Sequence, residues 1–210
     1  MRRVSWDPLT ESPPVWDGTW DACVVPVLDW PTLYAAYQHL ATGHHPFRSV
    51  VVDSLTEAQK RLVDDVAGVD QPSLPQWGVI ARNLEDMVRK LRDLTIHKTH
   101  PIEAVLIVCL THLRDGSTRP FLKGQIELSL PAFVDVVGYL YTEQIDGQIQ
   151  HRMLIAPVNN IIAKCRPDVL GDHGPVITDA KFTDWLDILE AGFGQQQTAI
   201  KSTSKEASTK

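Results

Sequence analysis

A single aspartate at the end of a short apolar run is the residue in this sequence best suited to chemistry. Asp53 follows Val50-Val51-Val52 and precedes two hydroxyl residues, Ser54 and Thr56, at the start of a helical pattern. An uninterrupted apolar run is typical of a strand covered on both faces, as in a parallel sheet between helix layers. The carboxylate would then lie at the carboxyl end of the strand, where open α/β sheets bind their ligands. A carboxylate in that position suits a hard, oxygen-preferring cation such as Mg²⁺.

The same residues also have an ordinary structural explanation. A buried strand can end in an aspartate that caps the following helix, and Ser54 is itself a favoured helix cap. The two interpretations of Asp53 explain this stretch equally well, so the rest of the chain has to separate them.

A second stretch repeats the pattern of an apolar strand that ends in polar residues. The run from Glu103 to Leu110 is followed directly by Thr111 and His112. His112 is therefore a second candidate for chemistry at a strand end, and the alternative is a histidine that only satisfies structural contacts. Cys109 and His112 have half of a zinc-binding spacing, but no second pair completes it, so we do not expect structural zinc.

Strands and helices alternate around these candidates, which indicates an α/β fold. The apolar runs predict strands at residues 22–28, 47–53, 103–110, 134–141 and 151–157. Apolar residues at helical spacing predict helices after Asp29, after Asp53, at 76–94 and at 183–190. Asp146-Gly147, between the last two strands, is a strong hairpin signal. The segments at 113–124 and 168–178 are predicted loops.

Length and composition favour one main domain. The chain has 210 residues, 43% of them hydrophobic and 22% charged, which suits a globular protein with a sizeable core. We expect an irregular amino-terminal segment at 1–21 and a main domain at 22–191. Residues 192–210 are rich in Gln, Ser, Thr and Lys, and we expect them to be disordered.

The charge balance limits the partners that the chain can have. A formal net charge of -6 and an isoelectric point near 5.7 argue against tight, general binding to duplex DNA. A local groove for a single strand is left open. Trp6, Trp16 and Trp20 in the amino-terminal segment are candidates for a partner surface, since tryptophans stack on single-stranded bases.

The remaining composition favours a cytoplasmic protein. The three cysteines are odd in number and far apart, so we expect no disulfide framework and a reducing compartment. The amino end carries two arginines without an apolar run behind them, so we expect no signal peptide. No apolar stretch approaches the roughly 20 residues that a membrane helix needs.

Several short motifs follow one another in a recognisable order. They are Pro46-Phe47-Arg48-Ser49-Val50-Val51-Val52-Asp53-Ser54-Leu55-Thr56, a tryptophan-bearing helix, a strand ending in Thr111-His112, Asp135-x-Val137-x-Tyr139-Leu140, a hairpin and Lys164-x-Arg166. This order resembles the RecA-like P-loop ATPase domain, of the AAA type, found in many bacteriophages. Some members of that family are proposed to act as single-strand annealing or recombination proteins. The resemblance covers most of the chain, from about Val24 to Glu190.

The resemblance implies a fold, an activity and partners. The implied fold is a RecA-like three-layer sandwich with a mostly parallel sheet, a C-terminal β-hairpin and an incomplete N-terminal portion. The implied activity is an ATPase that uses ATP and Mg²⁺ in DNA recombination or replication, in the host cytoplasm. The implied partners are single-stranded DNA, further copies of the chain, and phage recombination or replication proteins.

The resemblance also implies roles for residues at the two strand ends. Asp53 matches the Walker B aspartate, which assists Mg²⁺. Ser54 and Thr56 would hydrogen-bond near the water shell of the metal. His112 matches the polar residue that ends the next strand and acts as a sensor near the γ-phosphate.

A pair of cations completes the implied site. Lys164 and Arg166 match the Lys-x-Arg that RecA-like ATPases direct towards the nucleotide of a neighbouring subunit. Cations in that position stabilise charge on the transferring phosphoryl group. The alternative, a pair of solvated surface cations, remains open on spacing alone.

One central motif of the family does not occur in the sequence. No glycine is followed directly by a lysine, so the phosphate-binding loop G-x-x-x-x-G-K-[S/T] is absent. Under this resemblance we expect an amino-terminally truncated copy, a degenerate member, or a protein that borrows this loop from another polypeptide. We do not expect unaided ATP hydrolysis, because backbone amides and a lysine are needed around the phosphates.

Overall fold

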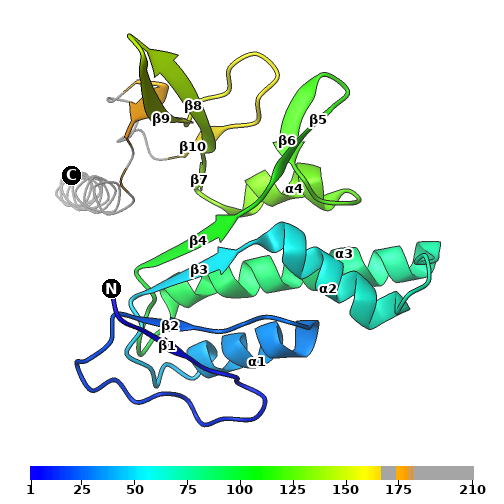
Figure 1. Cartoon of the computed structure of the whole chain (residues 1–210). Coiled ribbons are helices and arrows are strands. Elements are labelled where there is room, and N and C mark those ends of the chain that lie inside the picture. The colour runs from blue at the N-terminus through cyan, green and yellow to red at the C-terminus, as the bar shows by residue number, and fades with distance from the viewer. Residues whose placement is uncertain (167–173, 180, 182–210) are drawn as a thin grey trace, which may run out of the picture. The chain divides into compact units, whose positions relative to one another are not determined.

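The computed structural model describes residues 1–166, 174–179 and 181 (Figure 1). This part of the chain is mixed α/β, with four α-helices and several small sheets, which confirms the predicted α/β class. The chain divides into two compact units. Unit 1 comprises Met1–His112 and Pro120–Phe133, and unit 2 comprises Leu113–Arg119 and the described residues from Val134 onward. None of the described helices is long and apolar enough to cross a membrane.

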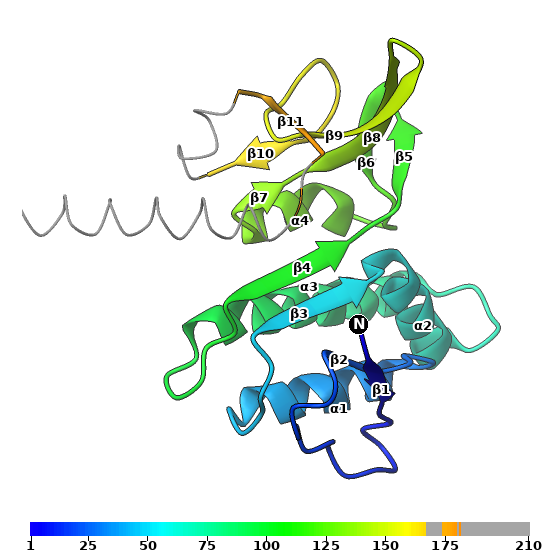
Figure 2. The same cartoon turned by 60° about the vertical axis from the view of Figure 1, so that its left-hand side comes forward.

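Two parallel strands form the centre of unit 1. Strand β3 (Ser49–Asp53) pairs in parallel with β4 (Ala104–Val108), and the two run side by side in both views (Figures 1 and 2). Parallel neighbours need a long crossover connection. Here the crossover contains two α-helices, α2 (Leu55–Ala67) and α3 (Leu74–Asp93), and the short 3-10 helix η1 (Leu94–Ile96). The predicted strands and helices of this region are confirmed.

The core of unit 1 lies between these strands and the helices of the crossover. Its fully buried side chains come from α2, from α3 and from α4 (Ile126–Phe133), and include Leu55, Leu62, Ile80, Leu84, Met87, Val88, Leu91 and Ile126. The strands contribute Val50, Val52, Val105 and Ile107, which pack against this cluster. One face of the β3–β4 pair is therefore covered by apolar side chains, as its sequence predicts.

The other face of the pair differs from the sequence prediction. Along β3 exposed and half-buried residues alternate, and Val51 retains 59% of its accessible surface. The expectation that this strand is covered on both faces is therefore wrong for the described residues. They also contain no large, mostly parallel sheet, because β3 and β4 pair only with each other.

Side-chain caps determine where the helices of unit 1 begin. The Asp29 carboxylate accepts a hydrogen bond of 2.8 Å from the backbone of Thr32 and starts α1 (Trp30–Ala41), as predicted. Ser54 caps α2 and Ser73 forms a capping box with Gln76 at the start of α3.

The amino-terminal segment is more ordered than its sequence suggests. Strand β1 (Arg3–Ser5) pairs in parallel with β2 (Ala22–Val24), so the expectation of a wholly irregular segment is wrong. Trp6 and Trp20 are buried, whereas Trp16 is exposed. Of the three tryptophans considered for a partner surface, only Trp16 is therefore accessible.

A hairpin follows β4, where a loop was predicted. Strand β5 (Thr111–Arg114) pairs with β6 (Ser117–Pro120) around Asp115 and Gly116, both of which have positive φ. Helix α4 then occupies residues for which no helix was predicted. Helix α4 contains Pro131, and its apolar residues supply part of the core of unit 1.

Unit 2 contains the second hairpin, which the sequence predicts. Strands β8 (Tyr139–Ile145) and β9 (Gln148–Leu154) are antiparallel and are joined at Asp146 and Gly147, which have φ of 51° and 80°. Residues with positive φ are what a tight hairpin turn requires. Strand β11 (Val176–Thr178) pairs with β9, so the predicted loop at 168–178 is wrong for these three residues. The short strands β7 (Val136–Val137) and β10 (Lys164–Cys165) pair with each other. The predicted helix at 183–190 and the tail at 192–210 lie outside the described residues.

We predict that Leu84→Ala destabilises unit 1 by about 2–5 kcal/mol, because it removes a fully buried side chain from α3 and leaves a cavity. Urea denaturation followed by circular dichroism measures the free energy of unfolding. Leu28→Ala is the matched control, since Leu28 is exposed and its truncation should change this free energy by less than about 0.5 kcal/mol. Equal losses in the two variants would contradict the packing described for α3.

Candidate functional site

Asp53 and Ser54 lie where strand β3 meets helix α2. The Asp53 carboxylate is exposed at the carboxyl end of β3, beside Val108 of β4, and accepts no hydrogen bond from the described residues. The peptide bond between Asp53 and Ser54 is cis. The Ser54 hydroxyl accepts a hydrogen bond of 3.3 Å from the backbone of Glu57 and caps α2. The structural role considered for Ser54 is thus confirmed, and the cap of α2 is Ser54 and not Asp53.

Thr56 connects the first turn of α2 to the end of β4. Only 4% of its surface is accessible, and its hydroxyl accepts a hydrogen bond of 3.1 Å from the backbone of Leu110. This contact brings the segment after β4 to the amino end of α2. Thr56 therefore has a structural partner, and a role near the water shell of a metal stays a prediction.

His112 forms a pair with a buried glutamate. Its Nε2 atom lies 3.1 Å from Oε2 of Glu127, a residue of α4 with only 3% of its surface accessible. The ring of Phe121 lies 5.0 Å from the imidazole, centroid to centroid. A carboxylate is seldom buried without a partner, and this contact orients the imidazole and favours a proton on Nε2. Nδ1 is then left as a hydrogen-bond acceptor.

Sequence reasoning missed Glu127. Its neighbours Ile126 and Leu128 are apolar, and no motif in the sequence surrounds it. One signal was present: Glu127 is the one charged residue in the mostly apolar run 126–134. A charged side chain in such a run is usually paired if it is buried, so a partner could have been expected. The partner could not be chosen from the sequence, since His112 is 15 residues away.

A glutamine holds the segment that passes between β6 and α4. The buried Gln59 side chain donates to the Lys123 carbonyl at 2.9 Å and accepts from the Lys123 backbone amide at 2.7 Å. This pair of hydrogen bonds satisfies both ends of the amide group. It ties residues 121–125 to α2 near Thr56 and His112.

A cavity of about 320 Å³ lies beside α2 in the same region. It is lined by Thr56, Glu57, Gln59, Lys60, Arg61, Val63, Asp64, Phe121 and Lys123. Lys60 and Arg61 form ion pairs with Glu57 at 3.2 and 3.0 Å, and the Lys123 ammonium lies over the ring of Trp77. These cations already have partners, so the lining does not form a ready cradle for phosphates.

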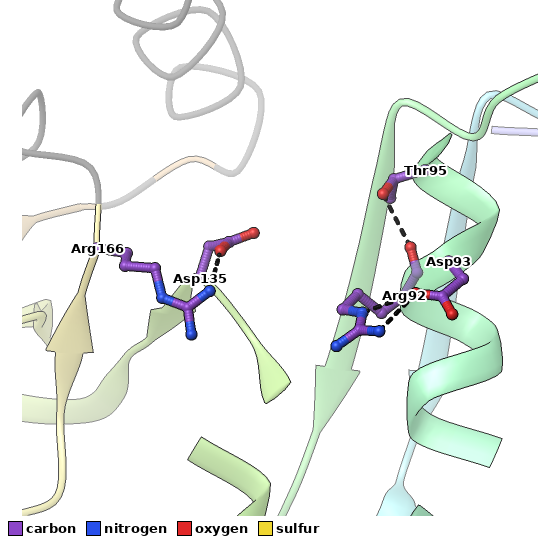
Figure 3. Close-up of polar contacts among 5 residues, drawn as sticks. All are labelled: Arg92, Asp93, Thr95, Asp135 and Arg166. Atoms are coloured by element: carbon purple, nitrogen blue, oxygen red, sulfur yellow. Dashed lines mark hydrogen bonds and ion pairs between the residues drawn. The ribbon is translucent and has the colours of Figure 1, made fainter. Parts of the chain in front are cut away.

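Lys164 and Arg166 belong to unit 2 and bond to the segment before β7. The Lys164 ammonium donates to the carbonyl of Val134 at 2.6 Å. Figure 3 shows the Arg166 guanidinium paired with Asp135 at 3.1 Å. Partial burial, reinforced by the charge of Arg166, lowers the pKa of Lys164 from its ordinary value. Both cations thus have local partners, and their implied role at a nucleotide stays a prediction.

The described residues offer no preformed site for a transition metal. No group of three or more histidine, cysteine, aspartate or glutamate side chains in that part of the chain could hold an ion. Burial raises the pKa of the Cys109 thiol to about 11, so it is protonated at neutral pH and a poor zinc ligand. For Mg²⁺ the requirement is smaller, because this ion often binds through one or two carboxylates, water and phosphates. The exposed Asp53 fits that pattern.

No protein family, curated protein or solved structure matches the chain.

We predict that Glu127→Ala lowers the free energy of unfolding by about 1–3 kcal/mol, because it removes a buried hydrogen-bond partner of His112. Glu127→Gln can still bond to the imidazole and should cost less. Glu103→Ala is the control, since Glu103 belongs to an exposed ion pair worth at most about 1 kcal/mol. Urea denaturation of the three variants gives the order, and a larger loss for Glu103→Ala would contradict it.

Proposed function

We propose that this chain is a RecA-like ATPase-family protein of bacteriophage DNA recombination or replication. In this proposal Asp53 assists Mg²⁺ at a nucleotide that copies of this chain bind weakly between subunits, and the phosphate-binding loop that hydrolysis needs is supplied by another polypeptide. The proposed fold is a RecA-like three-layer sandwich to which unit 1 contributes a parallel strand pair and one helix layer. The observation that carries the proposal is the parallel pairing of β3 with β4, which brings Asp53 and the His112 segment to one end of the strands.

The chemistry of the individual residues supports this assignment. Mg²⁺, when bound with ATP, would neutralise charge on the phosphates, and Asp53 is the exposed carboxylate placed to hold it directly or through water. His112, oriented by Glu127, offers an acceptor nitrogen that can position a water molecule or sense a phosphate. Lys164 and Arg166 would stabilise charge at the nucleotide of a neighbouring subunit.

A second candidate function follows from the missing phosphate-binding loop. The amino end of α2 cannot replace that loop, because backbone amides of its first turn already have partners. The Glu57 amide donates to the Ser54 hydroxyl, and the Ala58 amide donates to the Ser54 carbonyl. The chain would then be a non-catalytic protein of the same fold, acting in single-strand DNA binding or protein assembly. Nucleotide binding separates the two candidates.

We predict that the chain binds ATP in the presence of Mg²⁺ with an affinity in the millimolar range or better, and that Asp53→Ala weakens this binding about 10- to 100-fold. The expected factor is that for loss of a group that supports a metal directly or through its hydration shell. Titration of a fluorescent ATP analogue, with and without Mg²⁺, measures the dissociation constant.

Asp65→Ala is the matched control, because Asp65 is an exposed aspartate further along α2. It should leave the dissociation constant unchanged. The absence of binding at millimolar ATP would reject the ATPase assignment and favour the non-catalytic candidate. Binding that Asp53→Ala leaves intact would reject the role given to Asp53.

A further inference from the structure

Four histidines gather in unit 1 at the amino ends of strands β3 and β4, the ends opposite to Asp53. His39 is in the last turn of α1, His45 precedes β3, and His97 and His100 precede β4. The rings of His45 and His100 lie 4.7 Å apart and perpendicular, and those of His39 and His45 lie 6.3 Å apart, centroid to centroid. His97 accepts a hydrogen bond of 3.3 Å from the backbone of His100. We call these four residues the imidazole cluster.

A glycine permits the close packing of the imidazole cluster. Gly43, in the turn before His45, has φ of +68°, a conformation that other residues rarely adopt. A Cβ atom at this position would lie 2.7 Å from the ring of His97 and 2.7 Å from the Thr99 hydroxyl. The backbone of Gly43 therefore lies so close to the ring of His97 that a larger residue would not fit without a shift.

His45 is buried in the cluster without a counter-charge that favours its protonation. Only 8% of its surface is accessible, and among the described residues neither ring nitrogen makes a well-formed hydrogen bond, although the Leu40 backbone lies near the ring. Burial, followed by the charges of His100 and His39, lowers the pKa of His45 from 6.5. The Leu40 backbone acts in the opposite direction and raises this pKa, and a weaker contribution from His97 lowers it. Burial likewise lowers the pKa of His39.

The acidic side chains of residues 1–24, which are Asp7, Glu11, Asp17 and Asp21, all accept hydrogen bonds within that segment. His44 and Lys98 adjoin the imidazole cluster in the chain and can add only positive charge. Arg48 and Glu103, at the starts of the two strands, pair with each other at 2.6 Å. A proton on His45 would therefore be held in a buried place among three further imidazoles.

The imidazole cluster is also the place where the amino-terminal segment contacts the rest of unit 1 through aromatic rings. The Trp6 ring lies edge-on to His39 at 5.0 Å, and Trp20 lies 6.1 Å from Phe47. Phe47 in turn stacks on His45 at 5.8 Å. Both tryptophans are buried, so these ring contacts form part of the packing between residues 1–24 and the rest of unit 1.

We propose that the imidazole cluster is an acid-sensitive joint that holds the segment of residues 1–24 against the rest of unit 1 and releases it when His45 and His39 take up protons. In the closed state the His45 ring is buried and the His39 ring is half-buried, and in the open state both are hydrated and bind protons more readily. The closed state is fully favoured above pH 6.5 and loses stability as the pH falls below that value. This device is independent of any nucleotide.

Hydrogen exchange of the intact chain at pH 7.5 and 5.5 tests the proposal. The reporters are the amides of β1 and β2 and the Trp6 amide, which donates to the Val24 carbonyl at 3.0 Å. After correction for intrinsic exchange, their protection should fall at pH 5.5 by about 10-fold if one imidazole takes up a proton, and by up to about 100-fold for two. The amides of the β8–β9 hairpin serve as the internal reference.

Matched variants make the result specific. His45→Phe keeps an aromatic ring beside Phe47 but cannot titrate, so the loss of protection at pH 5.5 should shrink about 10-fold. His44→Phe changes an exposed neighbour and should behave like the unmodified chain. Equal protection at both pH values, or a His45→Phe variant with an unchanged response, would overturn the proposal. If His45→Phe fails to fold, titration of the His45 ring by NMR decides, and a pKa of 6.5 or above overturns the proposal.

Discussion

The parallel pairing of β3 with β4 is the constraint on which the rest of unit 1 depends. Parallel strands cannot be joined by a tight turn, so the chain must leave at Asp53, cross one face of the pair through α2 and α3, and return at Ala104. Packing of the crossover helices against the inward-facing valines then builds the core. The same geometry brings the carboxyl ends of both strands together, and with them Asp53 and the segment that leads to His112.

Around these carboxyl ends, hydrogen bonds connect segments that are far apart in the sequence. Thr56 bonds to Leu110, Gln59 bonds to Lys123 through two contacts, and His112 bonds to Glu127. These polar groups are buried or half-buried, and each would be costly to leave without a partner. The exposed Asp53 carboxylate differs from them, because it forms no hydrogen bond or ion pair with the described residues.

The two ends of the β3–β4 pair therefore have different chemistry. The carboxyl ends carry an exposed carboxylate and a histidine paired with a glutamate, whereas the amino ends carry imidazoles packed among aromatic rings. His112 hydrogen-bonds to a carboxylate, whereas burial among other imidazoles opposes protonation of His45. Histidines of one unit thus lie in two different environments, one beside a carboxylate and the other among imidazoles and aromatic rings.

Local patterns in the sequence were sufficient for the elements whose signals are strong. The apolar runs around Val51 and Leu106, the amphipathic period of α3, the Asp29 cap and the Asp146-Gly147 turn each act over a few residues, and the structure contains all of these elements. Tertiary structure alone decided which faces are covered, which buried glutamate meets His112, and that distant histidines share one cluster. These features depend on contacts between residues that are 15 to 55 positions apart, such as His112 with Glu127 and His45 with His100. Local propensity carries no information about such contacts, because they arise only when separate elements pack together.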